Sequence, residues 1–180
     1  MSNTSLVFLR ALDEGDLERT LRWHNDAELY SSLGDGFRFV SRAAEAEWLR
    51  RKSGFLADEV NLAICRTDSG EHIGNIYLRD INWVARRAVL HVFLGSGEQR
   101  GNGFGQQAVR LLLRHAFMDL NLNRIGLEVL ASNAAAVHVY EKCGFRAEGR
   151  LRAFAVKQGV AHDVIVMSVL ADEFRSAGDT

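Results

Sequence analysis

The chain has 180 residues, of which 47% are hydrophobic and 25% charged, and its formal net charge at pH 7 is −1. These values are typical of a water-soluble domain, and we expect one domain over residues 1–180. The balanced charge argues against a nucleic-acid-binding protein, and no apolar run is long enough to cross a bilayer. The start of the chain, Met1–Ser5, lacks the apolar core of a signal peptide, so the sequence predicts a cytoplasmic protein with no membrane partner.

The two cysteines give no sign of a metal site or a disulfide. Cys65 and Cys143 lie in apolar stretches and lack the close spacing of metal ligands. Because disulfides are rare in reducing compartments, we expect two free thiols and no bound metal.

The N-terminal part of the chain begins with a strand and continues with two helices. Leu6–Arg10 is short, apolar and partly β-branched or aromatic, as strands are. Asp13 is a helix-capping residue type and precedes a helix that we expect to end near Trp23. Ser41 caps a second expected helix, Arg42–Lys52.

Three strands are expected next. Val60–Cys65 and His72–Leu78 are apolar runs on either side of the turn residues Asp68–Gly70, which is the pattern of a β-hairpin. A third strand, Ala88–Leu94, follows after a short polar connection.

The next segment is rich in glycine and runs directly into an amphipathic helix. Gly101, Gly103 and Gly105 follow Arg100, and apolar residues then recur at helical spacing up to about Leu120. A helix that begins at a glycine turn leaves N–H groups unpaired at the positive end of its dipole, and such an end favours phosphate. The motif is neither a Walker A loop nor a dinucleotide fingerprint, and by itself it is also compatible with a purely structural turn.

The C-terminal third contains a strand, a short helix and a hairpin. Arg124–Leu130 alternates like a strand, and because a helix crosses between it and Ala88–Leu94, the two strands should be parallel neighbours. Asn133 caps a short helix that ends at Cys143-Gly144. The chain closes with a hairpin of two apolar strands, Leu151–Val156 and Val164–Leu170. This element order predicts an α+β domain built on one mixed sheet.

Two motifs on these elements resemble the signatures of the Gcn5-related N-acetyltransferase (GNAT) superfamily. Arg100–Gly105 fits its R/Q-x-x-G-x-G/A signature, and Asn133–Phe145 fits N-x-x-A-x-x-x-Y-x-x-x-G-F. Arg146–Gly149 and His162–Met167 resemble the branch that contains ribosomal-protein alanine acetyltransferases and spermidine acetyltransferases. The resemblance covers nearly the whole chain and implies a mixed, mostly antiparallel sheet of about seven strands flanked by about four helices.

The resemblance implies a single N-acetyltransferase domain that moves an acetyl group from acetyl-CoA to a primary amine. Backbone N–H groups of the glycine loop and the side chain of Arg100 would hold the pyrophosphate, while Val92–Leu94 would hydrogen-bond the pantetheine arm. Asn133 would contact the cofactor as well as cap its helix. The positions implied for cofactor binding are Val92, Phe93, Leu94, Arg100, Gly101, Asn102, Gly103, Phe104, Gly105, Gln106, Asn133 and Lys142.

Tyr140 is the residue expected to act in catalysis. By resemblance, its hydroxyl points at the thioester sulfur and protonates the leaving thiolate. A phenol with a pKa of about 10 can give a proton to a thiolate and is still protonated at neutral pH. A tyrosine that only fills the edge of the core is the alternative.

The sequence leaves open which base deprotonates the acceptor amine. Where many relatives carry Glu, this chain has Val89 and Leu90, which puts a direct carboxylate base in doubt. His91 has a suitable pKa, although a lone histidine on a strand is also compatible with a structural role. Three carboxylates could attract a cationic amine or could be solvated surface charges: Glu28, Asp26 and Asp80.

The acceptor is also open. A polyamine, an amino sugar and a protein N-terminus are all compatible, and each should bind between the segment His24–Gly36 and the last hairpin. A non-catalytic acyl-CoA-binding or sensor module is the alternative class, and the presence of Tyr140 favours the enzyme. Because relatives with this hairpin end often pair, a homodimer is a further expectation.

Overall fold

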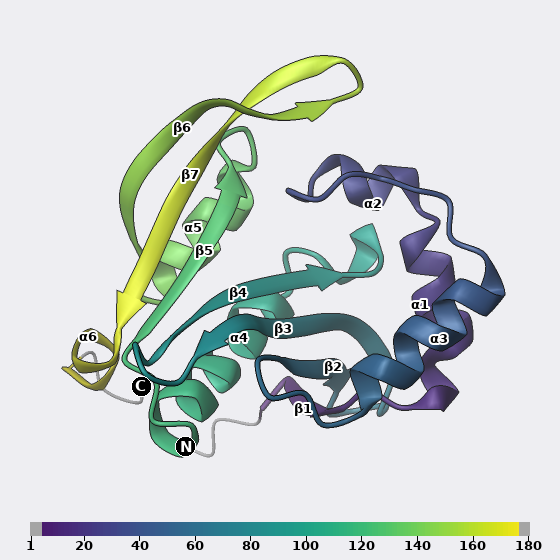
Figure 1. Cartoon of the computed structure of the whole chain (residues 1–180), viewed down its shortest axis with the longest axis horizontal. Helices are drawn as coiled ribbons and strands as arrows, with labels where there is room; N and C mark the ends of the chain where they lie inside the picture. Colours follow the sequence, from purple (N-terminus) through teal and green to yellow (C-terminus); the bar gives the residue numbers. More distant parts are fainter. Residues whose placement is uncertain (1–4, 177–180) are drawn as a thin grey trace.

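A seven-stranded sheet runs through the computed structural model, which describes residues 5–176 (Figure 1). Residues 1–4, which belong to the signal-peptide argument, lie outside this range. The strands are β1 (Val7–Ala11), β2 (Val60–Arg66), β3 (His72–Asn82), β4 (Arg87–Leu94), β5 (Arg124–Leu130), β6 (Arg146–Lys157) and β7 (Val160–Leu170). Their order in the sheet is β1-β2-β3-β4-β5-β7-β6, and all neighbours are antiparallel except β4 and β5. The expected α+β fold with a mostly antiparallel sheet is confirmed.

Six α-helices lie within the described range, two more than the sequence led us to expect. They are α1 (Leu17–His24), α2 (Ala27–Ser31), α3 (Arg42–Ser53), α4 (Phe104–Arg114), α5 (Ala134–Lys142) and α6 (Ala171–Ser176). The two that were missed, α2 and α6, have five and six residues, too few to show a helical period. In the described part of the chain, no helix has the length and apolar character needed to span a membrane.

The helix starts follow the capping residues of the sequence. Ser41 and Asn133 accept a hydrogen bond from a backbone N–H in the first turn of α3 and of α5. Asp26 caps α2 in the same way. Asp13 instead caps a short 3₁₀ turn, Glu14–Asp16, so α1 begins three residues later than this cap predicts. α4 differs, because its N-cap is Gly103, which has a φ of 81° and no side chain. The first-turn N–H groups of α4 are therefore left for another partner.

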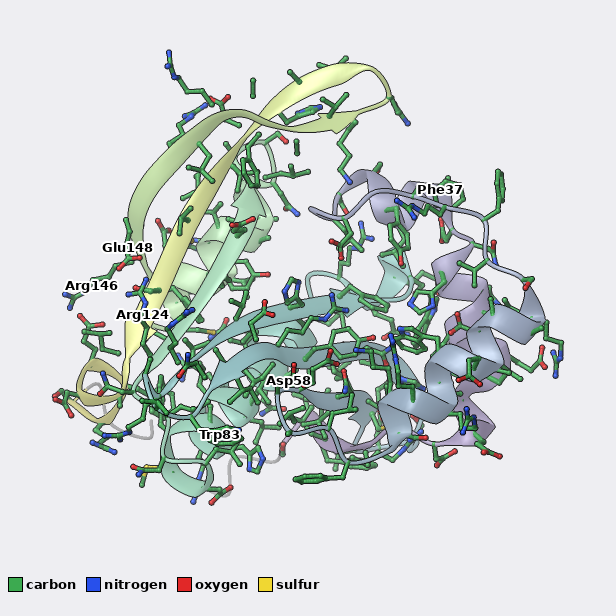
Figure 2. All side chains as sticks on the ribbon, viewed as in Figure 1. Phe37, Asp58, Trp83, Arg124, Arg146 and Glu148 are labelled. Atoms are coloured by element: carbon green, nitrogen blue, oxygen red, sulfur yellow. The ribbon has the colours of Figure 1, made fainter. Side chains whose placement is uncertain are left out.

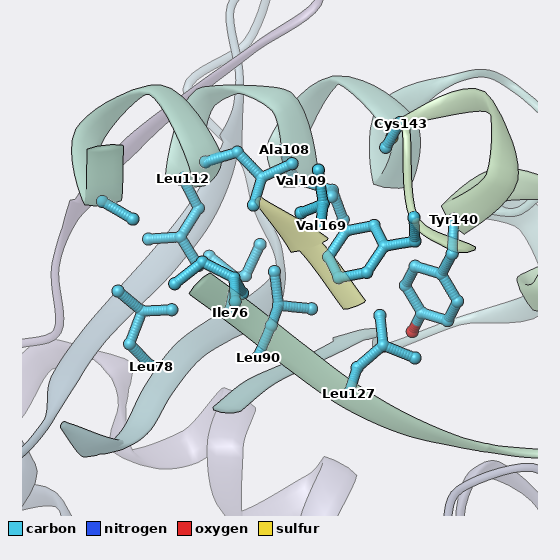
Figure 3. Close-up of a cluster of buried hydrophobic side chains, with 14 of the residues drawn as sticks. Ile76, Leu78, Leu90, Ala108, Val109, Leu112, Leu127, Tyr140, Cys143 and Val169 are labelled. Atoms are coloured by element: carbon cyan, nitrogen blue, oxygen red, sulfur yellow. The ribbon is translucent and has the colours of Figure 1, made fainter. Parts of the chain in front are cut away.

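The two faces of the sheet pack against different helices. On one face, Ile76, Leu78 and Leu90 meet Ala108 and Leu112 of α4 in the main core (Figure 3). On the other face, beneath α1 and α3, a smaller cluster contains Leu12, Leu49, Ala63, Cys65 and Tyr77. Because side chains alternate along a strand, neighbouring residues of β3 serve opposite faces.

The parallel strands β4 and β5 separate soon after they meet. Their pairing is confirmed, but it is limited to Arg87 with Arg124, Ala88 with Ile125 and Val89 with Gly126. Beyond these pairs β4 remains paired with β3 up to Leu94, while β5 remains paired with β7 up to Leu130. The sheet is thus split into two halves that diverge (Figure 1).

The C-terminal hairpin is longer than the sequence pattern suggested. β6 begins at Arg146, and Leu151 pairs with Val164 across the hairpin. At its base, Arg124 Nη1 of β5 donates to Glu148 Oε1 of β6 at 2.8 Å and to Ser168 Oγ of β7 at 2.9 Å. Figure 2 shows Arg124 and Glu148 together at this base. These contacts join the three strands of the second half of the sheet.

Candidate active site

Two adjoining cavities open where β4 and β5 separate. The larger has a volume of about 850 Å³ and the smaller of about 420 Å³. Val92, Phe93, Asn133 and Tyr140 line both of them, so the cavities meet along these residues. This arrangement can hold two reactants side by side.

The smaller cavity lies at the N-terminal end of α4. Arg100, Gly101, Gly103, Gly105 and Gln106 line it, together with Leu94 of β4. Gly101 and Gly103 have φ of 80° and 81°, a backbone region that glycine adopts without strain. The uncapped N–H groups of α4 and the positive end of its dipole make this cavity suited to phosphate or pyrophosphate.

Helix α5 forms another wall of the smaller cavity. Lys142 and the exposed His138, four residues apart, both line it. His138 was not predicted, although its helical spacing from Lys142 could have indicated it. Asn133 is held in place at both ends of its amide, because Oδ1 accepts from Ala136 N at 3.1 Å and Nδ2 donates to Ser32 O at 3.3 Å.

Two predicted cofactor residues have side chains outside the smaller cavity. Asn102 Nδ2 donates to the backbone oxygen of Glu98 at 3.0 Å. The ring of Phe104 is 9% exposed and packs in the main core, because it is the first apolar position of the amphipathic helix. The prediction for these two positions concerns their backbone N–H groups, which can still bind a ligand when the side chains lie elsewhere.

Tyr140 lies on α5 where the two cavities meet. It is 9% exposed, and its ring packs against Phe145 with ring centres 5.7 Å apart. Figure 3 shows its hydroxyl pointing away from α4 and toward Leu127. Burial raises the pKa of Tyr140 to about 12, so the phenol keeps its proton at neutral pH and is available as a proton donor.

His91 lines the larger cavity from β4, just past the last residue paired with β5. The ring is half-buried, and burial together with the nearby charge of Arg79 lowers its pKa. At neutral pH the imidazole is therefore uncharged and can accept a proton. Tyr77 lies directly opposite His91 on β3.

The carboxylates suggested by the sequence lie outside both cavities. The Asp26 carboxylate caps α2, while Glu28 and Asp80 are exposed side chains. Within the described residues, the carboxylates that line the larger cavity are Asp35, Glu45 and Glu128. Sequence reasoning missed Glu45, because an acidic residue in the first turn of a helix is normally a solvated partner of the helix dipole.

The larger cavity lies between the segment after α2 and the tip of the β6–β7 hairpin. Ser32 to Gly36 form one side, and Phe154 to Lys157 form the other. Lys157 Nζ donates to the backbone oxygen of Tyr30 at 3.1 Å and to that of Asp35. The hairpin is therefore tied across the cavity to the N-terminal half of the chain.

Comparison with known proteins identifies relatives along nearly the whole chain. The pattern of the acetyltransferase (GNAT) domain matches residues 7–146. The chain is 30% identical over 171 residues to spermidine N(1)-acetyltransferase of Vibrio cholerae serotype O1, covering 94% of this chain and 96% of that protein. It is 29% identical over 181 residues to the putative ribosomal N-acetyltransferase YdaF of Bacillus subtilis, covering 93% of each.

Solved structures agree with these similarities. The crystal structure of spermidine N-acetyltransferase from Vibrio cholerae in complex with CoA and spermine has a TM-score of 0.87 at 30% identity, covering 96% of this chain and 99% of that one. A dodecameric structure of the Vibrio cholerae enzyme in an intermediate state has a TM-score of 0.82 at 28% identity, covering 98% and 100%. The domain match, the split sheet and these relatives show that the chain belongs to the acetyltransferase (GNAT) family and is an acetyl-CoA-dependent N-acetyltransferase.

Proposed function

We propose that this chain acetylates a primary amino group of a small polyamine, with Tyr140 as the proton donor to the leaving thiol. The observation that carries the proposal is the position of Tyr140 at the junction of the two cavities. The relatives named as spermidine acetyltransferases support a polyamine acceptor. Carboxylates on the wall of the larger cavity give the negative charge that a cationic amine requires.

The smaller cavity suits the acetyl donor. The uncapped N–H groups at the start of α4 would hold the pyrophosphate, with the charges of Arg100 and Lys142 close by. Val92–Leu94 has no partner strand on β5 and would hydrogen-bond the pantetheine arm as a strand does. When bound, acetyl-CoA supplies the acetyl group as a thioester.

Two residues of the chain would move the protons. His91 accepts a proton from the acceptor's ammonium group, which frees the nitrogen lone pair to attack the carbonyl carbon directly. The O–H group of Tyr140 donates a proton to sulfur as the carbon–sulfur bond breaks, and the second proton that the nitrogen loses on becoming an amide restores the phenol. An N–H group of Val92–Leu94 would stabilise the charge that develops on the carbonyl oxygen.

A protein N-terminus is the second candidate acceptor. Arg38, Arg79 and Lys157 also line the larger cavity, and these cations favour an acceptor that carries carbonyl oxygens beside its amine. The similarity to the putative ribosomal N-acetyltransferase supports the same possibility.

An acceptor panel tests the proposal. Thiol release from acetyl-CoA is measured with spermidine, spermine, glucosamine and N-terminal peptides, and the acetylated products are identified by mass spectrometry. We expect kcat/KM for the polyamines to exceed that for the peptides by roughly 10-fold or more. Faster turnover of peptides would favour the second candidate. Thiol release without any acetylated product would contradict both and favour an acyl-CoA-binding module.

We further propose that the protein works in the cytoplasm as at least a homodimer. Its two buried cysteines, Cys65 and Cys143, are free thiols, which fits a reducing compartment. The dodecameric structure of the Vibrio cholerae relative supports self-association.

A further inference from the structure

Polar atoms without partners gather on one face of the sheet. Among residues 5–176, the buried side-chain atoms that lack a hydrogen-bond partner are Glu45 Oε1, Asn61 Oδ1, Asn75 Nδ2, Tyr77 OH and Arg79 Nε. Alternate residues of β3 share this face, and Asn61 lies opposite Tyr77 on β2. Unpartnered polar atoms are rare in protein interiors and costly, so such a cluster indicates that a ligand or water completes their hydrogen bonds.

Glu45 is the member of this group with the strongest need for a partner. Its side chain on α3 is 1% exposed and lines the larger cavity. One carboxylate oxygen, Oε2, lies 2.7 Å from His24 Nδ1, while Oε1 has no partner. A buried carboxylate is normally paired and hydrogen-bonded, because burying an unpaired charge is expensive.

Aromatic side chains line the same cavity as this carboxylate. Tyr30 and Trp48 line the same cavity, and the His24 ring packs edge-on against Trp48 with ring centres 4.7 Å apart. A carboxylate beside aromatic faces is an arrangement that attracts an ammonium group. The cations on the wall of this cavity are Arg38, Arg79 and Lys157. The Arg79 guanidinium lies 5.1 Å from the ring centre of Tyr77, and the Lys157 ammonium is bound by backbone oxygens of Tyr30 and Asp35, so neither of these two has Glu45 as its hydrogen-bond partner.

We infer that Glu45 binds a second ammonium group of the acceptor, remote from the amine that reacts. The inference rests on the proposed polyamine function. The reacting amine has to reach Tyr140 at the junction of the cavities, whereas Glu45 lines only the larger one. The group that meets Glu45 therefore belongs to the part of the acceptor that extends away from the junction. Glu45 therefore selects diamines and polyamines over monoamines. His24 positions the carboxylate of Glu45.

Glu45→Gln tests this role with two acceptors of equal length, 1,4-diaminobutane and n-butylamine. We expect KM for the diamine to rise roughly 10-fold or more, because the amide keeps the shape but loses the charge. We expect KM for the monoamine to change far less, so that the diamine-to-monoamine ratio of kcat/KM falls. Glu47→Gln is the matched control, since Glu47 lies on the same helix but is exposed and paired with Arg50.

A purely structural role gives a different result. If Glu45 only holds His24, Glu45→Gln lowers the thermal midpoint but leaves the diamine-to-monoamine ratio of kcat/KM unchanged, which overturns the inference. A second result also overturns the inference. If the wild-type enzyme prefers 4-aminobutyrate to the diamine and Arg79→Gln loses this preference, the group that binds remote from the reacting amine is an anion. If the wild-type enzyme acetylates no polyamine at all, the proposed function is wrong whatever Glu45→Gln does.

A second variant covers the case in which Glu45→Gln does not fold. Glu45→Asp keeps the charge and withdraws it by one methylene. We expect the preferred diamine, measured across a series of increasing chain length, to become one carbon longer. An unchanged optimum in a folded Glu45→Asp protein contradicts the inference.

Discussion

At the scale of single residues, burial determines the chemistry of Tyr140. The ring is fixed by its contact with Phe145, and the low exposure that raises its pKa also keeps its proton in place at neutral pH. The thiolate that departs beside it is desolvated in the same buried setting, which raises its basicity and lets it take the phenol proton. Tyr140 therefore needs no charged neighbour to act as a donor.

Tyr140→Phe removes the donor and leaves the packing intact. We expect kcat to fall roughly 100-fold, which is the size of a typical general-acid contribution. KM for acetyl-CoA should change little, because the ring still lines the same cavity wall. Initial rates at saturating acceptor measure the first quantity, and titration with CoA checks the second. A variant that turns over at the wild-type rate would exclude Tyr140 as the acid.

The sequence predicted residues whose role is local and missed one whose role is not. Ser41 and Asn133 were correctly identified as caps, because a cap depends on the next three residues. The setting of Glu45 depends on His24, 21 positions earlier on another helix. No local pattern shows that such a carboxylate is buried.

At the scale of elements, a glycine on β3 fixes the position of the strand that lines both cavities. A Cβ atom on Gly74 would lie 2.2 Å from the backbone oxygen of Phe93 and 3.0 Å from the Cα of Leu94. Only glycine allows β3 and β4 to approach this closely here. The position of Val92–Leu94 thus depends on a residue outside either cavity.

Gly74→Ala is expected to push this part of β4 away. We expect a loss of about 2 kcal/mol in the free energy of unfolding, together with a higher KM for acetyl-CoA. Gly126→Ala on β5 is the control, because its added Cβ meets only Met167 O, at an ordinary 3.7 Å. Urea denaturation and initial rates measure both effects. Equal stability of the two variants would show that the strands adjust without cost.

Elements with a long or alternating pattern were predicted well. β5 has the predicted bounds, and its parallel pairing with β4 follows from the crossing helix between them. The separation of the same strands was not predicted from the residues, since pairing in a sheet is set by the whole arrangement and not by either strand. The extra length of β6 was missed because its first residues are exposed and polar.

At the scale of the whole molecule, the two halves of the sheet meet at the short β4–β5 pairing and again at the hairpin tip. The Lys157 ammonium group spans the larger cavity to backbone oxygens of Tyr30 and Asp35. The acceptors are backbone oxygens, which every residue has at these two positions. Among the side chains of this contact, only that of Lys157 is therefore needed. It therefore holds the hairpin tip against the N-terminal half.

Lys157→Met keeps the length of the side chain and removes its donors. We expect KM for the acceptor to rise about 3-fold to 10-fold, with KM for acetyl-CoA and the thermal midpoint nearly unchanged. Amide hydrogen exchange over residues 32–36 should become faster. Arg152→Ala, an exposed change on the same hairpin, is the control and should affect none of these values. Slower exchange in Lys157→Met would mean that the lysine strains the loop instead of anchoring it.

The separation of β4 from β5 also affects which molecules can use the free strand edge. An unpaired edge on the outside of a sheet is open to other polypeptides and invites aggregation. Here the free edge of Leu90–Leu94 faces inward, toward β5, in the interior of the sheet. The edge there borders the smaller cavity, so a slender unbranched chain with amide groups that enters this cavity can pair with it. The fold thus presents its unpaired backbone to a ligand inside the molecule and not at the outer margin of the sheet.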